Sequence, residues 1–165
     1  MHLSELVRAH GDALLRAARY LGVREPDLED VVQDVFLIAL RRVEEVPADA
    51  RLPWLFGVLR KRVSESKRRA FRHREVLGLD VEKVSREGDE AALERRVLLN
   101  ALGRLDDEKR EVVVFHDIEE MTMREISEVL GVPLQTAYSR LYAGREALAK
   151  TLSAGRDENA EGVRP

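Results

Sequence analysis

The chain has 165 residues, of which 44% are apolar, 5% aromatic and 36% charged, and its formal net charge is −3. This length fits one medium domain or two small ones, and the few aromatic residues predict a small core under a large charged surface. The absence of cysteine excludes disulfides and is consistent with a reducing cytoplasm, while no apolar run approaches the ~18 residues of a membrane helix. We therefore expect a soluble protein without a signal peptide and without membrane insertion.

Charge is segregated along the chain, so the small net charge says little about nucleic-acid binding. Residues 51–75 carry nine bases and two acids (+7), and residues 134–156 carry four bases and one acid (+3). Residues 25–45 carry seven acids and two bases (−5), and residues 76–94 carry six acids and two bases (−4). Two basic blocks separated by acidic residues predict two anion-binding surfaces joined by a segment that avoids DNA.

The first 75 residues have the apolar periodicity of helices. Three segments show it: residues 3–21, 26–43 and 54–71. Gly22 ends the first segment, and residues 47–53 form a break between the second and the third. Trp54 lies in the apolar stripe of the third helix, so we interpret it as a core residue rather than a stacking platform.

A linker and a second helical unit follow. Residues 76–88 contain two glycines and no sustained period, which indicates an acidic linker. Four further helices are predicted: residues 89–102, 106–116, 122–130 and 133–152. Asp89 and Asp106 are expected to cap the first two, and residues 122–125 (TMRE) form a capping box for the third. Residues 153–165 are small and polar and predict a flexible tail.

No segment alternates with period two for long enough to predict a strand. The predicted fold is therefore all-α, with two small helical domains, residues 1–75 and 89–152, joined by the linker.

The sharpest local signal is a helix-turn-helix at residues 122–150. Two predicted helices meet at Gly131, where a tight turn benefits from a positive φ. Ser127 is small, as required where the second helix crosses closely over the first. An apolar stripe then packs the second helix down: Ala137, Leu141, Gly144 and Leu148.

The opposite face of this second helix carries short hydrogen-bonding groups and cations, which suit base edges and phosphates. The predicted DNA-binding residues are Gln135, Thr136, Ser139, Arg140, Tyr142 and Arg145. The alternative is an ordinary helical hairpin with a solvated polar face.

Both halves resemble one known family. Residues 101–115 (ALGRLDDEKREVVVF) and 123–141 (MREISEVLGVPLQTAYSRL) resemble region 4 of the extracytoplasmic-function (ECF) sigma factors of the sigma-70 superfamily. Three stretches are similar to region 2 of that family: 27–36 (DLEDVVQDVF), 52–56 (LPWLF) and 67–69 (KRR). The resemblance implies a transcription initiation factor that binds core RNA polymerase, directs it to promoters and aids promoter melting, with region 4 at the minus-35 element.

The resemblance also implies a polymerase contact on the acidic helix, against the clamp helices of the β′ subunit. The matching residues are Asp30, Gln33, Asp34 and Leu37. With Val31 and Val35 in the core stripe, these four side chains are expected to point outward, as an interface patch does. Pattern alone would favour an ordinary charged helix face, and the resemblance reverses that preference.

The basic helix is expected to contact DNA phosphates, since Glu65 is the only acid among its cations. The predicted residues are Arg60, Lys61, Arg62, Lys67, Arg68 and Arg69. By resemblance this helix and the loop before it, residues 45–53, engage the melted minus-ten element, with a flipped base captured by the loop.

Several positions depart from the family pattern. Lys61 and Glu65 stand where the family usually has Asn and Asp. In the second helix of the helix-turn-helix, Ala137 replaces a branched aliphatic residue, and Tyr138 and Tyr142 replace the common Lys and His. The promoter sequence is therefore not predicted.

Other functions are less compatible with the sequence. The four histidines are scattered, and there is no phosphate-binding glycine loop or nucleophile motif, so we expect no enzyme, cofactor or metal. A two-domain regulator acting without polymerase is the main alternative, but it would not need the acidic patch. The family further implies an anti-sigma partner. We expect weak or no DNA binding by the free protein, because the two DNA-binding units need polymerase to set their separation.

Overall fold

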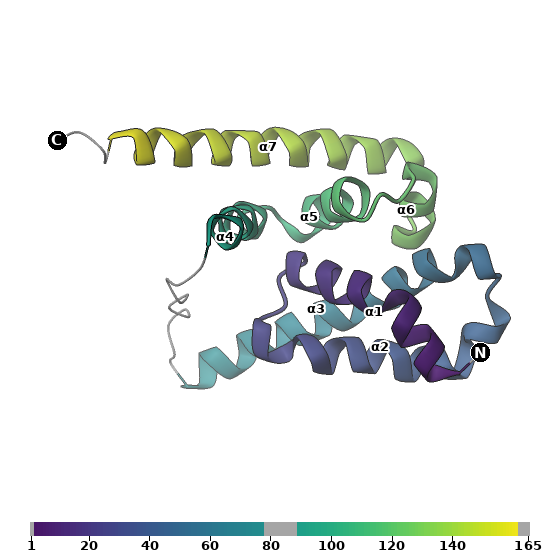
Figure 1. Ribbon diagram of the computed structural model, residues 1–165. Coiled ribbons are helices and arrows are strands. Elements are labelled where there is room, and N and C mark those ends of the chain that lie inside the picture. Colours follow the sequence, from purple (N-terminus) through teal and green to yellow (C-terminus); the bar gives the residue numbers. More distant parts are fainter. Residues whose placement is uncertain (1, 78–88, 162–165) are drawn as a thin grey trace.

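The computed structural model describes residues 2–77 and 89–161, with side chains for 2–76 and 89–156. All regular structure in these ranges is helical, which confirms the predicted all-α class (Figure 1). The longer helices are α1 (Leu3–Tyr20), α2 (Leu28–Arg42), α3 (Arg51–Leu77), α4 (Glu90–Gly103), α5 (Asp107–Val113), α6 (Met123–Leu130) and α7 (Leu134–Glu161). Four short turns join them: η1 (Glu25–Asp27), η2 (Val43–Glu45), η3 (Ala48–Ala50) and η4 (Val114–Ile118).

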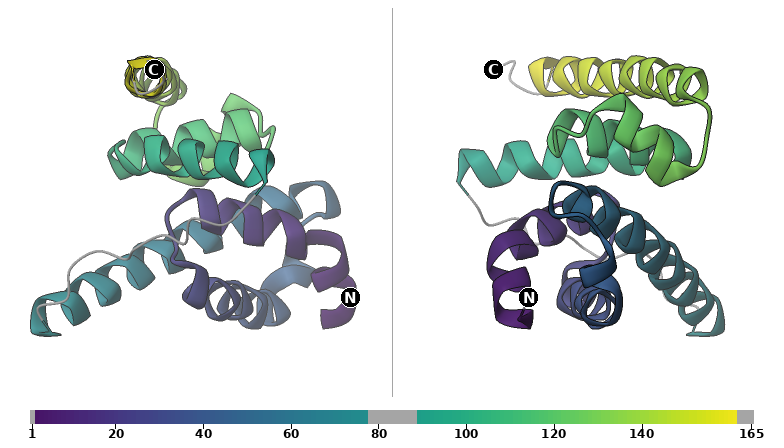
Figure 2. Two further views of the ribbon diagram at one scale, coloured as in Figure 1. Left: turned by 60° about the vertical axis from the view of Figure 1, so that its left-hand side comes forward. Right: turned by 90° about the vertical axis from the view of Figure 1, so that its right-hand side faces the viewer.

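The helices form two packed groups. Helices α1, α2 and α3 contact one another and form the first group. Helices α4 to α7 form the second group, in which α7 lies across α4, α5 and α6 on the side that faces away from α1, α2 and α3 (Figures 1 and 2). Helix α6 packs on α3, and η4 packs on α1. The second group therefore sits directly on the first in this structure. None of the described helices is both long and apolar enough to cross a bilayer.

One continuous core joins the two groups. The rings of Phe56 in α3 and Phe115 in η4 are fully buried, and their centroids are 5.5 Å apart. Leu59 and Ile126, from opposite groups, belong to the same apolar cluster. Sequence analysis predicted two domains joined by a linker and did not predict that they share a core. Most of that linker, residues 78–88, lies outside the described residues.

The predicted helix starts are largely confirmed because side chains cap them as expected. Asp89 accepts a hydrogen bond from the amide of Ala92, and Asp106 accepts one from the amide of Lys109, each at 2.9 Å. Thr122 and Glu125 complete the predicted capping box.

Two helices are longer than predicted. Helix α3 begins at Arg51, since Pro53 falls in its first turn, where a missing N–H costs nothing. It continues to Leu77 instead of ending near residue 71. Helix α7 continues to Glu161, so the predicted flexible tail is wrong for residues 153–161. The C-terminal extensions of both helices contain no proline, and they lack the apolar stripe on which the prediction depended.

Candidate nucleic-acid interfaces

The turn of the helix-turn-helix is fixed by backbone conformation and one hydrogen bond. Gly131 has φ +65°, and a Cβ there would meet nothing within 4 Å, so the glycine is needed for its dihedral angle rather than for space. Ser127 donates its hydroxyl to the carbonyl of Val132 at 2.6 Å, across the turn. The small residue predicted at position 127 thus has a bonding role as well.

Helix α7 is seated closely on α5. Ala137 and Leu141 are buried, as predicted. A Cβ on Gly144 would lie 2.8 Å from Cγ2 of Val113, so only a glycine allows this approach. The seating turns the polar face of α7 toward solvent.

The predicted DNA-binding residues of α7 lie on this outer face and its flanks. Gln135, Ser139, Tyr142 and Arg145 are exposed, and Thr136 and Arg140 are half-buried. The hydroxyl of Ser139 donates to the carbonyl of Gln135 within the helix.

Both arginines of this face are paired with acids of their own half. Arg140 is 3.0 Å from a carboxylate oxygen of Glu108, and Arg145 donates two hydrogen bonds to Asp117. These pairs orient the guanidinium groups. The hydrogen bond with Asp117 also raises the pKa of Arg145.

Helix α3 carries the second predicted DNA surface. Of its six predicted cations, Lys61, Arg68 and Arg69 are exposed, and Arg60, Arg62 and Lys67 are half-buried. Trp54 is half-buried and packs against the core, in agreement with its predicted role.

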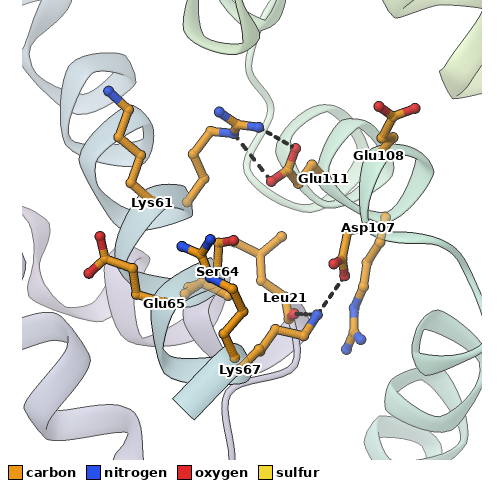
Figure 3. Close-up of a pocket in the computed structure, with 12 residues that line it drawn as sticks. Leu21, Lys61, Ser64, Glu65, Lys67, Asp107, Glu108 and Glu111 are labelled. Carbon is orange, nitrogen blue, oxygen red and sulfur yellow. Dashed lines mark hydrogen bonds and ion pairs between the residues drawn. The ribbon is translucent and has the colours of Figure 1, made fainter. Parts of the chain in front are cut away.

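Acids of α5 hold two of these cations. Arg60 donates two hydrogen bonds to Glu111, at 3.2 and 3.0 Å. Lys67 donates to Asp107 at 2.6 Å and to the carbonyl of Leu21 at 3.2 Å. Figure 3 shows both contacts around a cavity of about 320 Å³ between α3 and α5.

Sequence reasoning missed the acids of this contact. Asp107 and Glu111 are four residues apart and therefore share one face of α5. Their signal was present in the sequence, as a pair of carboxylates at helical spacing in a chain with a strongly basic helix. Nothing in the sequence, however, showed that α5 would lie against that helix.

The contact between Arg60 and Glu111 is partly desolvated. The side chain of Glu111 is 14% exposed, and burial raises its pKa despite the hydrogen bonds from Arg60. The desolvation of this carboxylate offsets part of what the pairing contributes, so we expect the pair to fix the alignment of the two helices more than it strengthens their association.

Arg110 forms a second joint between the groups. It is the one buried charged residue in the described part of the chain, and its Nε donates to the carbonyl of Tyr20 at 2.6 Å. Gly22, at φ +100°, makes room for it: a Cβ there would lie 2.7 Å from Nη1 of Arg110. One turn earlier in α1, Arg16 donates two hydrogen bonds to Glu119.

The acidic patch on α2 borders the basic surface of α3, because Asp30 and Asp34 line one cavity with Arg62 and Arg69. Asp30, Gln33 and Asp34 are exposed, and Leu37 is 51% exposed, whereas Val31 and Val35 are buried. The predicted outward orientation is thus present. Among the described residues, no cluster of three or more His, Asp or Glu side chains stands where it could hold a metal ion.

These features define a class: a helical DNA-binding protein with a helix-turn-helix, a separate basic helix and an acidic surface patch. Family models agree with this division, because sigma-70 region 2 matches residues 6–73 and sigma-70 region 4 matches residues 95–148.

Individual relatives and solved structures agree as well. The chain is 33% identical to the ECF RNA polymerase sigma factor SigL of Mycobacterium tuberculosis over 150 residues, covering 87% of this chain and 84% of SigL. It is similar to CnrH of Cupriavidus metallidurans, solved with the cytosolic domain of CnrY (TM-score 0.71, 30% identity, 92% and 88% of the two chains). It shares its fold with the sigma factor RpoE of Bartonella quintana, solved with the anti-sigma factor NepR (TM-score 0.78, 22% identity, 91% and 96%).

The chain belongs to the ECF RNA polymerase sigma factors. Its function is that of a transcription initiation factor, which directs RNA polymerase to promoters, and this is favoured over a regulator that acts without polymerase.

Proposed function

We propose that α2 docks on core RNA polymerase, against the clamp helices of β′, through Asp30, Gln33, Asp34 and Leu37. The observation that carries this proposal is their joint exposure on one side of a helix whose other side is buried. Two acids, an amide and an exposed leucine form a patch of the mixed kind found in protein interfaces. A DNA-binding regulator that works alone has no use for such a patch.

Promoter DNA is then contacted at two places. The minus-ten element is engaged by α3 and by the loop before it, through the six cations named above, with melting aided there. The minus-35 element is read by the outer face of α7, through Gln135, Thr136, Ser139, Arg140, Tyr142 and Arg145. The exposure of α7 and the basic surface of α3 support this assignment.

The packing of the two halves supports weak DNA binding by the free protein. Arg60 and Lys67 are less available to phosphates while they are bonded to Glu111 and Asp107. Binding to polymerase would have to separate α3 from α5 before all six predicted contact residues of α3 could reach DNA.

Regulation by a separate anti-sigma protein is supported by the relatives solved with CnrY and NepR. We assign the chain no catalytic activity, no cofactor and no metal, and place its action in the bacterial cytoplasm, where RNA polymerase works.

Co-purification with core polymerase tests the docking patch. Replacing Asp30, Gln33 and Asp34 with alanine is expected to abolish co-purification and run-off transcription together. A matched control replaces two exposed acids and one exposed amide of α4, as Glu90→Ala, Glu94→Ala and Asn100→Ala, and should leave both unchanged. Undiminished binding by the α2 variant, or no binding by the wild type, contradicts the proposal.

A further inference from the structure

Tyr138 and Tyr142 form an exposed aromatic pair on α7. Their ring centroids are 6.1 Å apart, with 26° between the ring planes, so the rings are stacked. Tyr138 is 39% exposed and Tyr142 is 62% exposed. Large aromatic surface left in water in this way commonly marks a contact with a partner molecule.

Core packing does not account for the pair. The side of α7 that faces α5 is filled by Ala137 and Leu141, which are 0% and 1% exposed. The tyrosines lie one helical turn apart on another side, where they pack on each other. This stacking limits the rotamers of both rings before any partner binds, which lowers the entropy cost of binding.

The surroundings of the pair indicate DNA as the partner. Tyr142 lies near Gln135 and Ser139 around the outer face of α7, because residues three, four and seven apart share one side of a helix. Arg140 and Arg145, the arginines beside this face, are paired with Glu108 and Asp117. The solvent-exposed surface in the middle of α7 therefore consists of apolar ring faces, bordered by hydrogen-bonding groups.

In the major groove, the apolar feature that distinguishes bases is the C5-methyl group of thymine. Cations select guanine through its O6 and N7 atoms, and ring faces cannot do so. We propose that Tyr138 and Tyr142 are specificity-determining residues of the minus-35 contact, which select thymine by packing against its C5-methyl group. The proposal rests on the proposed promoter contact of α7 and adds to it a base preference and a residue, Tyr138, that sequence reasoning left out of the DNA-binding set.

Run-off transcription with core polymerase tests this preference. A template library with a randomised minus-35 element first identifies the thymines that the wild type requires. Each is then replaced by deoxyuridine, which removes the methyl group alone. At the thymines under the tyrosines, wild-type transcription should fall about fourfold for each lost methyl contact.

Protein variants complete the comparison. Tyr138→Ala and Tyr142→Ala should transcribe less from the thymine template and should no longer distinguish thymine from deoxyuridine. Tyr138→Phe and Tyr142→Phe keep the ring faces and should behave as the wild type, which also controls for folding. Leu93→Ala, which removes an exposed apolar side chain from α4, should leave the preference unchanged.

The outcomes separate the inference from the function on which it rests. Alanine variants that retain the wild-type sensitivity to deoxyuridine overturn the inference, and so does an equal loss from every template, which would indicate a protein partner for the ring pair. Phenylalanine variants that lose the preference also overturn it, since the hydroxyl groups would then be the readers. A wild type that transcribes from no library member contradicts the promoter contact itself.

Discussion

The two DNA-facing helices of this protein present their functional groups in opposite ways. Helix α3 relies on cations, and two of them are bonded to acids of the other half of the molecule. Helix α7 presents polar and aromatic groups to solvent, and its Arg140 and Arg145 are bonded to acids of its own half. Ion pairs between cations and carboxylates thus have two different effects. Acids from the other half of the molecule cover the DNA surface of α3, whereas acids from the same half orient the arginines of α7.

Helix α5 contributes to both effects. Through Val113 it supports α7 at Gly144, and through Glu111 and Asp107 it holds α3. Moving the second half away from α3 would therefore leave the helix-turn-helix assembled while releasing the cations of α3. The difference between a covered and an open surface can be tested by changing α5 and its neighbours.

The largest effect is expected from reversing the acids that hold α3. In the variant Asp107→Lys, Glu111→Lys, a lysine would face Arg60 where a carboxylate now accepts two hydrogen bonds. Two like charges about 4 Å apart cost ~4 kcal/mol at an effective dielectric constant of ~20. We expect the halves to separate, and binding of a labelled single-stranded oligo-dT to tighten on the order of tenfold at low salt, as for two regained phosphate contacts.

Fluorescence anisotropy measures this binding, and small-angle X-ray scattering measures the expansion. The added positive charge is controlled by Glu90→Lys, Glu94→Lys, which makes the same change on the exposed side of α4. Equal DNA affinity and equal radius of gyration for the two variants would show that α5 does not cover α3.

A smaller effect should follow from Gly144→Ala, which disturbs the open helix rather than the covered one. The new methyl group would lie 2.8 Å from Val113 and 3.3 Å from the backbone of Lys109, so α7 must move away from α5. We expect a loss of about 1–3 kcal/mol in the free energy of unfolding by urea, a magnitude typical of overpacking. Gly155→Ala, at a helical position with open space, should not destabilise the protein.

A comparable or slightly smaller loss is expected from Gly22→Ala at the joint between the halves. Alanine is strained at φ +100°, and its Cβ would displace the guanidinium group of Arg110 from the carbonyl of Tyr20. Backbone strain of this kind costs about 1–3 kcal/mol. Because Arg110 can move, the loss should lie near the low end, and urea unfolding measures it. The double variant Gly22→Ala, Arg110→Ala should lose less stability than the sum of the losses of the two single variants. A loss equal to that sum would rule out the steric coupling between the two positions.

These effects also mark how far the sequence alone could lead. The turn at Gly131, the cap at Thr122 and the outward face of α7 were all predictable, since each depends on residues close together in the chain. The contact of Arg60 with Glu111 was not, because it joins residues 51 positions apart whose encounter depends on how two helical units pack. The ends of α3 and α7 were missed for a different reason: both helices continue, uninterrupted by proline, after the apolar stripe has ended.

The smallest expected effect is the pH dependence of the covered surface. Burial raises the pKa of Glu111 above its usual 4.5, so the folded protein holds this proton more tightly than the unfolded chain does. From pH 4.5 up to the raised pKa, the folded state binds more protons, and the contribution of Glu111 to stability therefore decreases as the pH rises. Glu25 acts in the opposite sense, because its hydrogen bond with Arg19 lowers its pKa. Its contribution to stability is therefore lost in acid, as the pH falls below the usual pKa of a glutamate.

Urea unfolding at about pH 5 and about pH 7 measures this dependence. The free energy of unfolding at pH 7 minus that at pH 5 should be smaller for the wild type than for Glu111→Gln, because only the wild type loses the contribution of Glu111 as the pH rises. Identical changes in the two proteins would mean that Glu111 is not buried against α3 in solution, and that the surface described here as covered is open.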